Sequence, residues 1–166
     1  MRAVLVLILA LAVAGPAHAD IEVSFREGAP VDRFLITHRG ECPLAAARVT
    51  IDLRNSAGEL IFDTTAEGAG VEVFQPFRVV RGGGFLLTAP IVMDGAQQVT
   101  LDLADMPVGG VIEITTDLDD TLGARAITVS GNEFFGTRLL VGFKGMTRSI
   151  GFEDSTTVTV PLDTCR

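Results

Sequence analysis

Three carboxylates follow an apolar stretch of the chain: Asp117, Asp119 and Asp120 come directly after residues 111–116. In an extended strand, side chains two positions apart point to the same side, about 7 Å from each other along the chain. A turn at Asp120 would bring the third carboxylate near the first two. Because like charges repel at such separations, the cluster favours a bound hard cation. Calcium, which takes about six to eight oxygen ligands, is the ion we expect.

Further oxygen ligands can come from other parts of the sequence. The candidates are Glu27 and Asp32 after the first expected strand, Asp63, and Glu133 after the turn residues 130–132. The competing interpretation is a solvated acidic turn whose aspartates hydrogen-bond their own backbone. The sequence has no EF-hand spacing, with its central glycine and closing glutamate, that would decide between the two.

The segments that would position these side chains alternate apolar and polar residues with the period of a β-strand. In residues 48–54, Val49, Ile51 and Leu53 alternate with polar side chains, which predicts one buried and one exposed face. Turn-forming residues separate such segments, and helical patterns are scarce. We therefore predict an all-β fold, a single antiparallel β-sandwich, with Ig-like and jelly-roll topologies both open. Further strands are expected at residues 21–25, 34–37, 60–63, 71–80, 85–87, 99–103, 111–116, 126–129, 139–143 and 156–162.

The first nineteen residues have the pattern of a secretory signal peptide. Arg2 precedes an apolar run, and Ala17-His18-Ala19 forms a small-residue cleavage site. We expect residues 1–19 to be removed and residues 20–166 to form the sandwich domain, secreted or periplasmic. The apolar run is shorter than the roughly 20 residues that span a bilayer, so no membrane span is expected in the mature chain.

The two cysteines, Cys42 and Cys165, both lie in the expected mature domain. An even number of cysteines in an oxidising compartment predicts a disulfide between them. The formal net charge of −8 argues against a nucleic-acid partner, because the phosphate backbone is itself an anion. The same negative charge would attract a cation or a basic partner.

Four segments of the chain together resemble a known group of proteins: FREGAPVDRF at residues 25–34, GELIFD at 58–63, GAGVEVF at 68–74 and DLDDTLG at 117–123. The chain resembles small exported bacterial proteins labelled aggregation factor core proteins. That resemblance implies a part in extracellular adhesion, with calcium dependence residing in residues 117–120.

Three functions remain open at this stage. The first is an exported, non-catalytic binding or adhesion module that recognises an unidentified protein or cell-surface partner and is stabilised by calcium. The second is a small secreted hydrolase that uses paired carboxylates. The third is a structural domain of an envelope assembly that completes a sheet through an exposed edge strand, for which residues 139–143 and 156–162 are the candidates.

Overall fold

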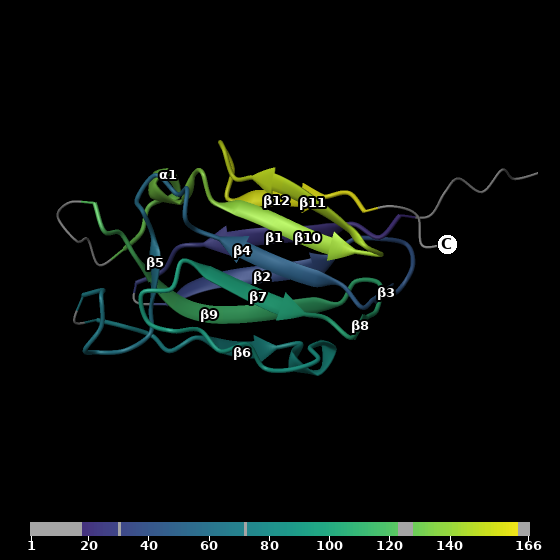
Figure 1. The fold of residues 1–166 in the computed structure, drawn as a ribbon, viewed down its shortest axis with the longest axis horizontal. Helices are drawn as coiled ribbons and strands as arrows, with labels where there is room; N and C mark the ends of the chain where they lie inside the picture. Colours follow the sequence, from purple (N-terminus) through teal and green to yellow (C-terminus); the bar gives the residue numbers. More distant parts are fainter. Residues whose placement is uncertain (1–17, 30, 72, 123–127, 163–166) are drawn as a thin grey trace, which may run out of the picture.

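Two antiparallel sheets pack against each other in the computed structural model, which describes residues 18–162 except 30, 72 and 123–127 (Figure 1). One sheet has the strand order β12-β1-β2-β9-β5, with β6 also paired to β9; the other has the order β11-β10-β4-β7. The predicted all-β sandwich is confirmed. The strands are β1 (Ile21–Arg26), β2 (Asp32–His38), β3 (Leu44–Ala45), β4 (Arg48–Asp52), β5 (Ile61–Asp63), β6 (Arg78–Arg81), β7 (Gln98–Asp102), β8 (Asp105–Met106), β9 (Val111–Asp119), β10 (Arg138–Phe143), β11 (Met146–Gly151) and β12 (Thr157–Val160).

The core lies between the sheets and is built from the alternate residues of each strand. In β1, for example, Ile21, Val23 and Phe25 are buried, whereas the residues between them are partly exposed. Phe134, from the short helix α1 (Gly131–Phe134), stacks on Phe25 with ring centroids 4.1 Å apart. In a chain without tryptophan or tyrosine, phenylalanines therefore supply the large aromatic contacts of the core.

Two predicted strands differ in the structure, and the reason is local. Of residues 71–80, the last three belong to β6, whereas residues 71 and 73–77 lie outside the strands. Of residues 85–87, Phe85 ends the 3₁₀ helix η1 (Gly83–Phe85) and the other two follow it. The helix begins after Gly82, which has a left-handed conformation with a φ of 73°. The run of three glycines thus forms a turn where continuous alternation predicted a strand. Of the strand expected at residues 126–129, residues 126 and 127 lie outside the described residues, and residues 128 and 129 are not in a strand.

The long strand β9 organises one end of the sandwich. Its first part pairs with β2 and β6, and its last three residues pair with β5. The registers place Asp63 opposite Asp117 and Asp32 opposite Thr116. Carboxylates from three distant parts of the sequence therefore meet at the end of β9.

Some expectations fall on residues that the structure does not describe. Most of the predicted signal peptide and Cys165 lie outside the described residues, so cleavage after Ala19 and the Cys42–Cys165 disulfide stay predictions. Within the described part of the chain, none of the helices has the length and apolar character needed to cross a membrane.

Candidate metal site

A buried group of three aspartates lies on the outer side of the six-stranded sheet at the end of β9. Asp63 and Asp117 are directly paired residues of β5 and β9, and Asp119 is two residues beyond Asp117. All three side chains therefore point to the same side of the sheet. One carboxylate oxygen from each lies within 4.8 Å of the others, and their exposed fractions are 0%, 2% and 2%. We call Asp63, Asp117 and Asp119 the aspartate triad.

The triad has few hydrogen-bond donors around it. Neither carboxylate oxygen of Asp63 receives a hydrogen bond from an N–H or hydroxyl group, since its polar neighbours are the carboxyl groups of Asp94 and Asp119, and Oδ1 of Asp119 also receives none. Oδ2 of Asp119 accepts a hydrogen bond from the Val71 backbone N–H. None of the four ion pairs found among the described residues involves the triad. Buried carboxylates without compensating donors or cations are costly, which points to a missing positive group.

The protonation of the metal-free triad reflects this environment. Burial, followed by the charges of Asp32, Asp119 and Asp63, raises the pKa of Asp117 to about 8. Burial, followed by the charge of Asp119 and the contact with Asp94, raises the pKa of Asp63 to about 7. At neutral pH the site therefore holds protons that a divalent cation would displace.

A loop that begins after β5 closes over the triad. Asp94 holds residues 64–69 of this loop, since its Oδ1 accepts hydrogen bonds from the backbone N–H groups of Thr64 and Thr65 and its Oδ2 accepts one from that of Ala69. These donors lower the pKa of Asp94 despite the opposing effect of burial. Next along the chain, Gly70 lies directly against the carboxylates of Asp63 and Asp119. The triad is thus enclosed between the sheet and this loop.

Gly70→Ala should open this enclosure. A Cβ atom at position 70 would lie 2.3 Å from Cγ of Asp63 and 2.4 Å from Oδ2 of Asp119. The loop must shift to relieve the overlap, so we expect a destabilisation of about 1–3 kcal/mol and a weakened response to calcium in thermal unfolding. Gly84→Ala is the matched control, because nothing lies within 4 Å of its new Cβ. Equal effects of the two substitutions would contradict the close approach of Gly70.

Asp32 and Asp120 are buried near the triad but are not part of it. Asp32 is 1% exposed and accepts hydrogen bonds from the backbone N–H groups of Gly28 (2.9 Å) and Leu118 (3.0 Å). Because it pairs with Thr116, its side chain starts on the opposite face of the sheet from Asp117. Burial raises the pKa of Asp32 to about 7, against the lowering effect of these donors. Asp120 is 5% exposed, and its Oδ1 has no hydrogen-bond partner.

The two predicted glutamate ligands are not brought into the triad. Glu133 belongs to a capping box at the start of α1, where its Oε2 accepts hydrogen bonds from the backbone N–H (2.7 Å) and the hydroxyl (2.8 Å) of Ser130. Glu27 is exposed. Of the seven predicted ligands, the structure groups Asp63, Asp117 and Asp119.

Glu133→Gln separates the capping role from a ligand role. Glutamine can also close a capping box, so we expect the melting temperature to change by about 2 °C or less and the calcium response to stay the same. The measurement is thermal unfolding with and without calcium. A calcium response reduced in this variant as strongly as in a triad variant would assign Glu133 to the ion.

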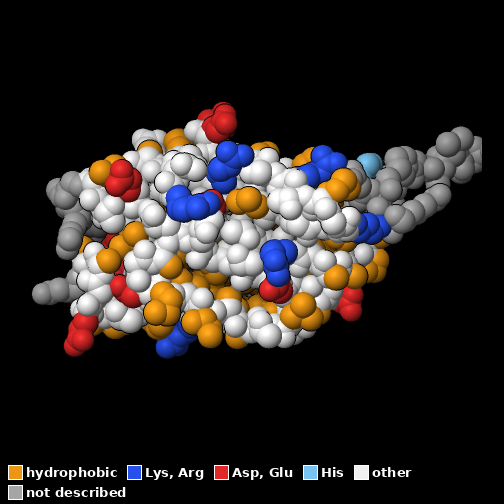
Figure 2. Space-filling model, viewed as in Figure 1, with side chains coloured by type: hydrophobic (Ala, Val, Ile, Leu, Met, Phe, Trp, Pro, Cys, Tyr) orange, Lys and Arg blue, Asp and Glu red, His pale blue; other side chains and the backbone are white. Residues whose placement is uncertain are grey.

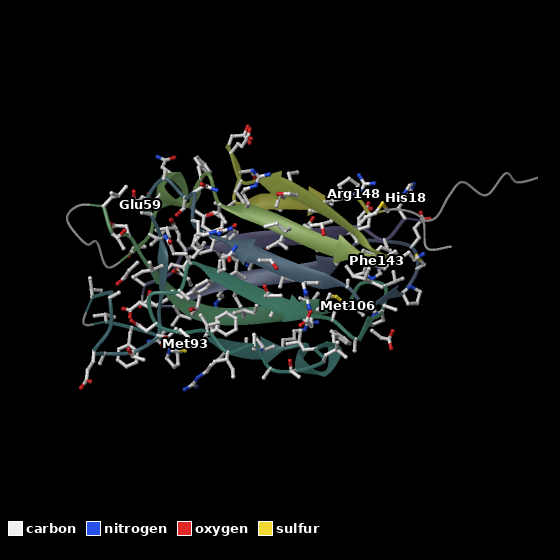
Figure 3. All side chains as sticks on the ribbon, in the orientation of Figure 1. His18, Glu59, Met93, Met106, Phe143 and Arg148 are labelled. Atoms are coloured by element: carbon white, nitrogen blue, oxygen red, sulfur yellow. The ribbon has the colours of Figure 1, made fainter. Side chains whose placement is uncertain are left out.

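Asp94 is the functional residue that sequence reasoning missed. The pair Asp94-Gly95 indicates a turn, and Gly95 does adopt a left-handed φ of 72°. That signal does not show that the aspartate holds a distant loop. Figure 3 labels Met93, which lies at the same end of the sandwich as β5, and so locates this turn.

Comparison with known proteins assigns no family to the chain. No protein-family model matches the chain, and no curated protein matches it. Among solved structures, a family GH18 chitinase from Chromobacterium violaceum is similar over 83% of this chain, with 16% identity and a TM-score of 0.39. The chain spans about 19% of the length of that chitinase. A likeness this weak carries no argument about activity.

Proposed function

We propose that the protein is an exported, non-catalytic binding module in which a bound calcium ion holds the loop of residues 64–71 against the sheet. The observation that carries the proposal is the aspartate triad: three carboxylates within 4.8 Å of one another, at most 2% exposed, with three oxygens that receive no hydrogen bond from an N–H or hydroxyl group. A cation at this point compensates the charges and joins β5, β9 and the loop.

The chemistry of the donors favours calcium over other metals. All three side chains of the triad offer oxygen, which suits hard cations, whereas zinc and copper prefer sites with nitrogen or sulfur. Calcium accepts irregular sets of carboxylates, backbone carbonyls and water, while magnesium requires a near-ideal octahedron. Here the backbone of the loop packs against the carboxylates, so the ligands come from an irregular set of groups, which favours calcium over magnesium.

The surface next to the site supports a binding role. Residues 73–93 contain two arginines and no acidic residue, although the whole chain has a net charge of −8. This stretch carries most of the exposed large hydrophobic side chains among the described residues, and Figure 2 shows hydrophobic side chains gathered along the edge formed by β6 and the segment that follows it. They are Val73, Val80, Leu87, Ile91 and Met93. Such patches are typical of interaction sites, and adhesion is the role that the family resemblance implies.

The geometry gives less support to a hydrolase. A glycosidase needs two carboxyl groups on either side of a bound sugar, roughly 5–10 Å apart and open to a cleft. Here the triad is at most 2% exposed, and Gly70 packs against it. A polymer cannot reach these carboxylates while the loop stays closed.

Limited proteolysis tests whether calcium holds the loop. Glu67 is exposed within residues 64–71, so a glutamate-specific protease can cleave there when the loop opens. We expect calcium to slow cleavage after Glu67 by roughly tenfold relative to protein in a chelator, and to leave cleavage after the exposed Glu153 unchanged. Equal rates of cleavage after Glu67 in both conditions would contradict the proposed role of the ion.

A further inference from the structure

The edges of the two sheets are not protected in the same way. β6 has an arginine at each end, Arg78 and Arg81, and β11 has Arg148 in its middle. The free side of β7 is covered by a neighbouring segment, through the hydrogen bond from Leu87 N–H to the Asp102 carbonyl (2.8 Å). The free side of β5 is covered by the bond from Phe62 N–H to the Ala96 carbonyl (2.8 Å). Charges and covering segments are the usual means by which edge strands avoid unwanted pairing.

Within the described part of the chain, β12 has neither form of protection. Its sequence is Thr-Val-Thr-Val, without a charged residue, and among the described strands it pairs only with β1. The other candidate edge strand was residues 139–143. These residues belong to β10, which is an inner strand paired with β4 and β11. Among the strands that the structure describes, β12 is therefore the unprotected edge.

The backbone of β12 presents hydrogen-bonding groups on its free side. Phe25 N–H donates to the Thr156 carbonyl (2.8 Å), and bonded pairs alternate along an antiparallel ladder. In the register with β1, Val158 and Val160 therefore bond to β1, and the N–H and carbonyl groups of Thr157 and Thr159 point away from it. The Thr157 N–H is taken by Ser155 Oγ (3.1 Å), which leaves the Thr157 carbonyl and both backbone groups of Thr159 for a partner.

A groove of about 400 Å³ runs beside this edge, between β12 and β11. Its lining includes Thr157, Val158 and Thr159 on one side, Ile150 on the other, and the acidic residues Glu153 and Asp154. Glu153 and Asp154 are both exposed, so they lie where an incoming basic side chain can reach them.

We infer that the free edge of β12 is a docking site for an extended polypeptide segment with basic side chains, which joins the six-stranded sheet as an additional strand. Backbone pairing with Thr157 and Thr159 supplies the affinity, and Glu153 and Asp154 select for lysine or arginine. A second copy of this chain is a poorer occupant, because two chains of net charge −8 repel each other. The inference goes beyond the proposed calcium module and does not depend on the metal.

A labelled synthetic peptide tests the docking site. The probe is a peptide of about nine residues that alternates valine and threonine and carries a lysine near each end, titrated against the whole protein by fluorescence anisotropy. We expect binding at micromolar concentrations. The same peptide with glutamates in place of the lysines should bind at least about fivefold more weakly, as should the original peptide against the Glu153→Gln, Asp154→Asn double variant. No binding up to about 1 mM peptide would overturn the inference.

Two paired changes show whether the contact is a strand addition. Thr159→Pro removes the outward N–H while keeping the bonds to β1, and should weaken peptide binding at least about tenfold; Thr159→Val keeps the N–H and should bind normally. A peptide N-methylated at alternate positions gives the same comparison without altering the protein, and should also lose binding. Peptide binding that survives both changes would overturn the inference. The inference would also be overturned if the protein alone formed a dimer and Thr159→Pro dissociated it, because a second copy would then be the occupant of the edge. Binding should be equal with calcium or chelator, which separates this test from that of the proposed function.

Discussion

Calcium added at pH 8 is expected to raise the melting temperature of the metal-free protein by about 8 °C at a concentration of about 100 times its dissociation constant. At pH 5 the same concentration should raise it by only about 1–2 °C. The difference arises because the ion must displace protons from the triad, and burial raises the pKa of Asp117 to about 8 and that of Asp63 to about 7. Differential scanning fluorimetry in matched buffers is the measurement.

The stability of the metal-free protein should fall as the pH rises, whereas the stabilisation by calcium should grow. The folded-state pKa values of Asp32, Asp63 and Asp117 lie above the ordinary value of 3.8, so between about pH 4 and pH 8 the folded chain binds more protons than the unfolded chain. Stability then falls as the pH rises through this window. We expect the melting temperature in chelator to be lower at pH 8 than at pH 5. A calcium response of equal size at both pH values, or metal-free stability that rises from pH 5 to pH 8, would contradict this account.

Asp117→Asn should stabilise the metal-free protein at pH 8 and remove most of its response to calcium. Asparagine keeps the shape of the side chain but carries no charge, so the repulsion with Asp63 and Asp119 falls while the ion loses a ligand. We expect a gain in melting temperature on the order of 5 °C in chelator at pH 8, and little change at pH 5, where the native carboxyl is already protonated.

Asp105→Asn is the matched control for that variant. Asp105 is an exposed aspartate on β8, so its substitution changes the net charge equally without touching the triad. It should leave both the melting temperature and the calcium response close to those of the unaltered protein. If Asp117→Asn instead destabilises the metal-free protein at pH 8 and keeps the full calcium response, the triad does not bind the ion.

Much of the fold follows from local pattern in the sequence. Alternation in residues 48–54 predicts β4, and the same rule places Asp117 and Asp119 on one side of a strand, as the structure has them. The loop before β6 could not be predicted in this way. Residues 71–77 are apolar enough for a strand, but residues 71 and 73–77 lie outside the strands, and the backbone N–H of Val71 donates a hydrogen bond to Asp119 of the triad.

The composition of the site depends on strand register, which the sequence does not encode locally. Asp63 joins the triad because β5 pairs with the end of β9, whereas Asp32 pairs one position earlier and so starts on the other face. Glu133 was predictable in principle. Ser130 and Glu133 have the spacing of a capping box. This spacing indicates a helix start more strongly than the negative charge of Glu133 indicates a metal ligand.

Calorimetric titration of calcium into the metal-free protein at pH 8 tests the central claim most directly. The account predicts one ion per chain and a release of protons, which appears as a heat of binding that changes linearly with the ionisation enthalpy of the buffer. It predicts no measurable heat of binding for Asp117→Asn. Absence of binding to the unaltered protein at millimolar calcium, or equal binding by Asp117→Asn, would show that the aspartate triad is not a calcium site.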